Sequence, residues 1–141
     1  MSRPGQASAR SGRLVLLVKI LVVEDHPDSR EILTTQLKGM GYQVIEAATG
    51  EEGVEKAVAS LPNLIIMDLG LPGIKGIEAT QRLKQNPATA RIPVIALTAW
   101  NEKDFREEAE KAGIVEFLTK PTPRYQLQAT IERFLKKSKS Y

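Results

Sequence analysis

The 141-residue chain contains no cysteine and only one histidine, His26. Without cysteine there is no disulfide bond, thiol nucleophile or cysteine-ligated metal, which is compatible with a reducing compartment. A single histidine excludes a histidine-rich metal centre. Long apolar runs are also missing, because the segment from Leu14 to Val23 is interrupted by Lys19 and is too short to span a membrane. We therefore expect a cytoplasmic protein without a membrane segment.

Residues 1–13 consist almost entirely of Ser, Arg, Gly, Pro, Gln and Ala and include no acid, a composition that favours disorder. A secretory signal is disfavoured because Glu24-Asp25 stand where small residues would be needed for cleavage. An organelle transit peptide remains an alternative. We expect a disordered basic tail over residues 1–16, one folded domain over 17–136 and a short C-terminal tail over 137–141.

The net charge of +3 invites a nucleic-acid interpretation, but the excess positive charge lies at the ends of the chain. Six basic residues lie in the tails: Arg3, Arg10, Arg13, Lys136, Lys137 and Lys139. The remaining 14 basic residues are outnumbered by 17 acidic ones, so the body carries about three negative charges. Neither tail has interleaved aromatics or a helix-turn-helix pattern, and we expect no DNA-binding domain.

Short apolar runs followed by amphipathic stretches recur along the body and predict βα units. The predicted strands are Ile20–Val23, Tyr42–Ala47, Leu64–Met67, Pro93–Thr98 and a short run before Pro121. Five such units predict an α/β fold of the doubly wound (βα)5 type, a three-layer sandwich with a parallel five-stranded sheet between two layers of helices.

Several residues are typical of helix ends. Pro27 to Lys38 is predicted to be helical, and Thr49 with Glu52 forms a capping-box pattern. Asn101 can cap the fourth helix and Gly113 can end it, while Thr122-Pro123 fits an N-cap and a first helical position.

Most predicted strands end at residues that carry chemistry. Glu24 and Asp25 follow the first strand, Asp68 the third, Thr98 the fourth and Lys120 the fifth. The carboxyl ends of parallel strands share one edge of the sheet, so these side chains are expected to meet there. Three clustered carboxylates repel one another, and Mg2+, a hard cation that prefers oxygen ligands, removes the conflict. A metal ion, the Lys120 ammonium and the Thr98 hydroxyl around one carboxylate can position a phosphoryl group and neutralise its charge. This arrangement suits transfer of a phosphoryl group onto that carboxylate.

These positions also have ordinary structural explanations. Asp25 or Asp28 can simply cap the first helix, and Lys120 can be a surface lysine. Phe117 can be part of the core. The argument for a site rests on the acids, Thr98 and Lys120 occurring together.

The sequence resembles the receiver domain of two-component response regulators, the CheY-like family, over residues 19–135. The resemblance rests on four segments in the family's order: ILVVEDHPDSR (20–30), LIIMDLGLPGIKG (64–76), IPVIALTAW (92–100) and EFLTKP (116–121). It implies the strand order 2-1-3-4-5 and a cis peptide between Lys120 and Pro121.

The resemblance also implies the role of each site residue. Asp68 is implied to be the phosphoacceptor, Lys120 the lysine that contacts the phosphoryl group, and Thr98 and Phe117 the switch residues. The implied magnesium ligands are Glu24 (through water), Asp25, Asp68 and the carbonyl oxygen of Gly70.

The resemblance implies a stand-alone receiver that signals by binding a partner and is not an enzyme with a separate substrate. Such a receiver catalyses its own phosphorylation and dephosphorylation. The phosphodonor is expected to be a sensor histidine kinase or a histidine phosphotransfer protein. The effector or dimer surface is expected on the fourth helix, fifth strand and fifth helix, roughly Asn101 to Phe134, in a monomer or a phosphorylation-dependent dimer.

The residues leave three alternatives to a phosphate-accepting receiver. A phosphatase of the haloacid dehalogenase type needs a second acid where this chain has Gly70, and a flavin-binding electron carrier needs a phosphate loop where it has Glu24-Asp25-His26. A receiver that no longer accepts phosphate is the third, and all four motif groups argue against it. Gly70 and Trp100 depart from common family usage, so the lifetime of a phosphorylated state is not predicted.

Overall fold

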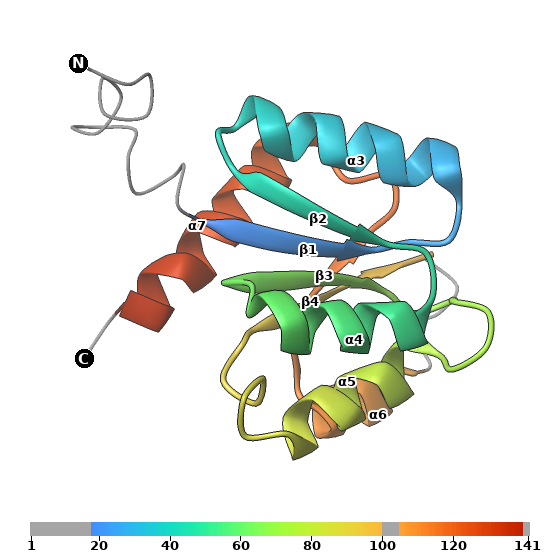
Figure 1. The fold of residues 1–141 in the computed structure, drawn as a ribbon. Coiled ribbons are helices and arrows are strands. Elements are labelled where there is room, and N and C mark those ends of the chain that lie inside the picture. Colours follow the sequence, from blue (N-terminus) through green and yellow to red (C-terminus); the bar gives the residue numbers. More distant parts are fainter. Residues whose placement is uncertain (1–17, 100–104, 140–141) are drawn as a thin grey trace.

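The computed structural model describes residues 18–99 and 105–139, with side chains up to Lys136 (Figure 1). The strands in this part are β1 (Lys19–Val23), β2 (Gln43–Ala47), β3 (Leu64–Asp68), β4 (Val94–Thr98) and β5 (Ile114–Thr119). The helices are α3 (Pro27–Gly39), α4 (Gly50–Ser60), α5 (Gly76–Gln85), α6 (Arg106–Ala112) and α7 (Arg124–Lys139). The predicted N-terminal tail, Trp100 and the predicted cap Asn101 lie outside the described residues.

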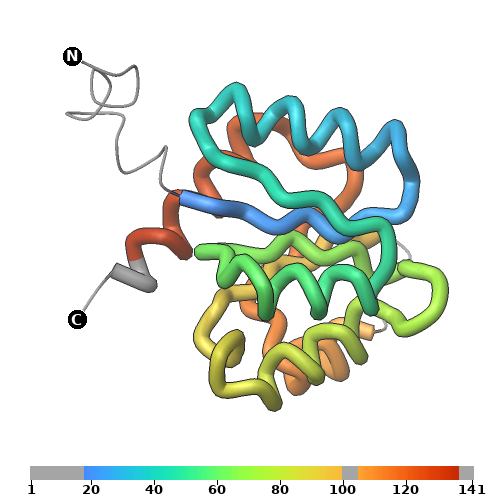
Figure 2. Tube along the Cα trace, in the orientation of Figure 1, coloured from blue at the N-terminus to red at the C-terminus, as the bar shows by residue number. Residues whose placement is uncertain are grey.

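The five strands form one parallel sheet in the order β2-β1-β3-β4-β5, which confirms the predicted order. Helices α3 and α7 cover one face of the sheet, and α4, α5 and α6 cover the other, as Figures 1 and 2 show. This arrangement is the three-layer sandwich that the alternating βα pattern predicts.

Two apolar clusters, one on each face of the sheet, form the core. Ile20 and Val22 of β1 point into the cluster under α3 and α7, whereas Leu21 and Val23 point into the cluster under α4, α5 and α6. Because side chains alternate between faces along a strand, a strand covered on both sides must be apolar throughout. This explains why the central strands β1, β3 and β4 are nearly continuous apolar runs, whereas the edge strand β2 carries the exposed residues Gln43 and Glu46.

The strand register brings the ends of neighbouring strands into line. Asp68 at the end of β3 pairs with Leu97, and Thr98 at the end of β4 pairs with Thr119. The Lys120 N–H, directly after β5, donates to the Thr98 carbonyl at 2.9 Å. The chemistry-bearing residues predicted at the strand ends therefore lie along one edge of the sheet.

The helix ends confirm some predictions and correct others. The Glu52 N–H donates to Thr49 Oγ1 at 3.0 Å, which confirms Thr49 as the N-cap of α4. The return bond differs from a strict capping box, because Glu52 Oε1 accepts from the N–H of Ala48, the residue before the cap, at 2.7 Å. Gly113 ends α6 with a φ of 118°, the left-handed conformation that favours glycine.

The N-terminus of α3 differs from the capping alternative considered for its acids. His26 is the N-cap residue, and no side chain makes the capping hydrogen bond. Asp25 and Asp28 are therefore not helix caps, and the Asp25 carboxylate is left for another role.

The start of α7 also differs from the prediction. The helix begins at Arg124, so Thr122 is not its N-cap. The Thr122 hydroxyl instead donates to the Thr119 carbonyl at 2.9 Å, at the end of β5. The peptide bond between Lys120 and Pro121 is cis, as expected.

Candidate functional site

Asp68 ends the central strand β3 and is only 4% exposed. Its Oδ1 accepts a hydrogen bond from the Gly70 N–H at 3.0 Å, which orients the carboxylate. Gly76 begins α5 close behind it, and a Cβ at Gly76 would lie 2.5 Å from the Asp68 carbonyl oxygen. Only glycine therefore allows this close approach between α5 and the end of β3.

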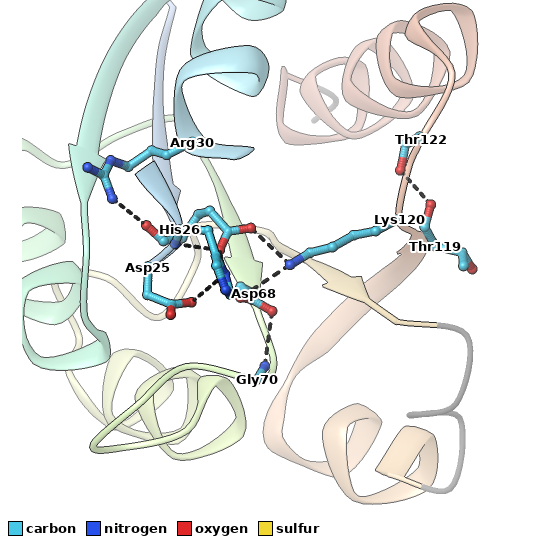
Figure 3. A network of polar contacts seen from close by, with 9 residues as sticks. Asp25, His26, Arg30, Asp68, Gly70, Thr119, Lys120 and Thr122 are labelled. Atoms are coloured by element: carbon cyan, nitrogen blue, oxygen red, sulfur yellow. Dashed lines mark hydrogen bonds and ion pairs between the residues drawn. The ribbon is translucent and has the colours of Figure 1, made fainter. Parts of the chain in front are cut away.

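Lys120 reaches from the end of β5 to two of the acids, as Figure 3 shows. Its Nζ lies 2.9 Å from Glu24 Oε1 and 3.3 Å from Asp68 Oδ2. Glu24 is 1% exposed and also accepts from the His26 N–H through Oε2 at 3.1 Å. One ammonium group therefore bridges carboxylates from the ends of β1 and β3.

Burial and charge pull the pKa values of these groups in different directions. Burial raises the pKa of Asp68 from 3.8 to about 6, the Glu24 charge adds to the rise, and the Gly70 N–H and Lys120 oppose it. For Glu24, burial also acts to raise the pKa, but hydrogen bonds from Lys120 and the His26 N–H outweigh it and lower the pKa. Burial would lower the pKa of Lys120, yet its two carboxylate partners raise it. The site therefore has more negative charge than one lysine can neutralise.

Asp25 completes the group of acids, and its carboxylate is poorly satisfied. Its Oδ1 is buried and has no hydrogen-bond partner among the described residues. The His26 ring lies nearby, with Nδ1 3.5 Å from Asp25 Oδ1 and 3.5 Å from Glu24 Oε2. A buried carboxylate oxygen without a donor beside a second acid is the kind of group that a cation satisfies.

The donor set fits magnesium in its chemistry. Carboxylate oxygens from Glu24, Asp25 and Asp68 are hard ligands, and the Asp25 oxygen still lacks a partner. In the described part of the chain, the three residues whose possible ligand atoms all lie within 4.8 Å of one another are Glu24, Asp25 and His26. Asp68 is joined to this set through Lys120, whose Nζ contacts both Glu24 and Asp68.

The two predicted switch residues lie close to the site, and their roles stay predictions. Thr98 ends β4 beside Asp68 and is 8% exposed, and no hydrogen bond between these two side chains is found in the described region. Phe117 on β5 is partly buried, and the Arg106 guanidinium lies 4.6 Å from the centre of its ring. For Gly70 the structure gives the N–H contact to Asp68, while the predicted role of its carbonyl stays a prediction.

Two residues of the site were missed by the sequence reasoning. His26 was considered only as the single histidine of the chain, although it directly follows the acid pair. Arg30 was not considered, yet its Nη1 donates to the Glu24 carbonyl at 2.8 Å. The signal was available, because Arg30 lies four residues after His26 and so returns to the same side of α3.

The fold and the buried carboxylates with their lysine define a class of doubly wound α/β domains with an acidic site at the carboxyl ends of the strands. The family model of the Response regulator receiver domain matches residues 20–132. The chain therefore belongs to the response regulator receiver family of two-component signalling.

Curated relatives differ in how much of their length this chain spans. Protein PilH of Pseudomonas aeruginosa is 34% identical over 119 residues, which cover 84% of this chain and 98% of PilH. The phosphate regulon transcriptional regulatory protein PhoB of Rhizobium meliloti is 36% identical over 124 residues, covering 88% of this chain but 55% of PhoB. The chain thus spans about half of PhoB and almost all of PilH.

Solved structures agree with the family. One is the receiver domain of sensor histidine kinase PA1611 from Pseudomonas aeruginosa, whose structure has a magnesium ion coordinated in the active-site cleft. It is 34% identical to this chain, with a TM-score of 0.79, and the match covers 84% of this chain and 97% of that one. Another is chemotaxis protein CheY4 of Vibrio cholerae, which is 27% identical with a TM-score of 0.79. That match covers 83% of this chain and 98% of CheY4. In the part of this chain that the structure describes, no helix has the length and apolar character needed to cross a membrane.

Proposed function

We propose that this receiver accepts a phosphoryl group on Asp68 and signals through a protein partner. The observation that carries the proposal is the buried Asp68 carboxylate, held by the Gly70 N–H and by Lys120 beside a second and third acid. Its pKa of about 6 means that the carboxylate is largely ionised near neutral pH and able to act as a nucleophile.

A magnesium ion held by Asp25, Asp68 and, through water, Glu24 would supply positive charge and a template for the phosphoryl oxygens. An Asp68 oxygen attacks phosphorus, the new O–P bond forms as the N–P bond of a phosphohistidine breaks, and the electron pair stays on the imidazole nitrogen. Lys120, already 3.3 Å from Asp68 Oδ2, is placed to neutralise charge on the transferred group. Attack of water at phosphorus later breaks the O–P bond and restores the carboxylate.

The phosphodonor in this proposal is a histidine kinase or a histidine phosphotransfer protein. A cleft of about 350 Å3 between α3 and the start of α7 is lined by Glu24 and Lys120 and by apolar residues that include Ile32. Ile32 is 63% exposed. This cleft offers a protein donor an apolar contact next to the site, and we place the exchange in the cytoplasm.

The output in this proposal is a change on the surface of α6, β5 and α7. An added phosphate brings about −1.5 to −2 charges, enough to draw the Thr98 hydroxyl and Lys120 toward Asp68. Because the Lys120 N–H is bonded to the Thr98 carbonyl, movement at one strand end is passed to the other. Phe117 on β5 would then change its contacts.

Intact-mass spectrometry after incubation with acetyl phosphate tests this function. We expect the mass to increase by one phosphoryl group when magnesium is present and to stay unchanged with a chelator. Asp28→Asn, which alters an exposed acid on α3, is the matched control and should react like the wild type. Labelling that persists in a chelator would argue against the proposed chemistry.

A further inference from the structure

Arg30 connects three elements beside the acid pair. It lies in α3, its Nη1 donates to the Glu24 carbonyl after β1 at 2.8 Å, and its Nε lies 3.2 Å from Glu46 Oε1 on β2. Figure 3 shows its guanidinium reaching toward the backbone close to Asp25 and His26. The side chain is 21% exposed, so most of it is enclosed by these neighbours.

The bond to the Glu24 carbonyl matters because of Asp25. The Glu24 carbonyl belongs to the peptide that joins Glu24 to Asp25, so its direction sets where the Asp25 side chain leaves the backbone. The Glu24 carboxylate is held by Lys120 and the His26 N–H, but Asp25 Oδ1 has no hydrogen-bond partner among the described residues. The position of the Asp25 carboxylate therefore depends on its backbone, and Arg30 holds that backbone.

We propose that Arg30 is a positioning residue that orients Asp25 for magnesium. The inference rests on the proposed function of the site. Arg30 touches neither the phosphoryl group nor, in this proposal, the ion. Its planar fork suits the task because it can bond the Glu24 carbonyl and the Glu46 carboxylate at once, which a single ammonium group does less well.

Electrostatics and positioning predict opposite effects of Arg30→Ala. Removing a positive charge beside three carboxylates would by itself strengthen binding of a divalent cation. Losing a residue that orients a ligand weakens metal binding by about 10- to 100-fold. A weaker affinity therefore cannot be explained by the charge of Arg30.

The experiment is calorimetric titration of magnesium chloride into the folded protein, with folding checked by circular dichroism. We expect Arg30→Ala to weaken magnesium binding by about tenfold or more. Arg30→Lys keeps the charge but not the fork, and we expect a smaller loss in the same direction. Arg82→Ala is the matched control, because Arg82 forms a more exposed pair with Glu78 on α5 and should leave the affinity unchanged.

Arg30→Ala binding within about twofold of the wild type, or more tightly, would overturn the inference while leaving the proposed function intact. An equal loss in Arg82→Ala would also overturn it, because the effect would then be general. If Arg30→Ala does not fold, Arg30→Lys decides, and an affinity equal to that of the wild type would count against positioning. A wild-type protein that binds no magnesium would refute the proposed function itself, and the inference with it.

Discussion

Asp68→Asn should make the magnesium-free protein more stable at pH 8. Asp68 is 4% exposed, and its pKa lies near 6 instead of 3.8 mainly because burial disfavours the charged form. That difference corresponds to about 3 kcal/mol of destabilisation once the group is fully ionised. Asparagine is neutral and can still accept from the Gly70 N–H, but it loses the contact with Lys120. We therefore expect a net gain of about 1–3 kcal/mol.

The sign of the pH dependence follows from the raised pKa. An acid with a higher pKa in the folded state takes up its proton on folding, so stability increases as the pH falls from about 6 toward 4. The advantage of Asp68→Asn over the wild type should therefore shrink between pH 8 and pH 4.5. Urea unfolding followed by circular dichroism, with a chelator present, measures this difference. Titratable groups that do not contact Asp68 contribute equally to both proteins.

Asp28→Asn is again the control, because Asp28 is an exposed acid in the first turn of α3 and its loss should not stabilise the protein. The reasoning fails if Asp68→Asn is no more stable than the wild type at pH 8. It also fails if the gain is the same at both pH values, since the effect would then not come from the charge of Asp68.

Three further variants test the site and its support. Lys120→Ala should stay folded but accept phosphate from acetyl phosphate at least about tenfold more slowly, since it removes the cation between two buried acids. An unchanged labelling rate would exclude a role of Lys120 in phosphoryl transfer. Thr98→Ala should be phosphorylated normally yet bind an effector less well after phosphorylation, and equal binding in a pull-down would contradict the proposed switch. Gly76→Ala should lower the free energy of unfolding by about 1–3 kcal/mol, because its Cβ would meet the Asp68 carbonyl oxygen at 2.5 Å. Gly39→Ala is the control, because a Cβ at Gly39 would meet only the end of the Arg124 side chain. In chemical denaturation, Gly39→Ala should lower the free energy of unfolding by less than Gly76→Ala does.

The order of elements could be predicted from the sequence largely because the central strands β1, β3 and β4 are buried on both faces. Residues such as Ile65 and Ile66 face opposite helical layers, so both must be apolar, and this produces the short continuous runs. The polar residue that ends most of these runs then marks the edge where the site forms. This is why the sequence alone groups Asp68, Thr98 and Lys120, although their individual roles come from the family resemblance.

The details that depend on competition between neighbouring groups could not be predicted. The Thr122 hydroxyl could either cap α7 or bond the end of β5, and it donates to the Thr119 carbonyl. The raised pKa of Asp68 depends on how many groups surround it in three dimensions, which spacing along the chain does not give. Arg30 lies four residues after His26, and this spacing places it near the acid pair, but spacing alone does not identify the Glu24 main-chain carbonyl as its acceptor.

The central claim, that Asp68 receives the phosphoryl group, is tested most directly by mapping the modified residue. Borohydride reduces an aspartyl phosphate to homoserine, which peptide mass spectrometry locates at a single position. After treatment with acetyl phosphate and magnesium, we predict homoserine at residue 68 of the wild type and none in Asp68→Asn. Homoserine at Asp25 or at another acid, or its absence from a protein whose intact mass shows one phosphoryl group, would contradict the account.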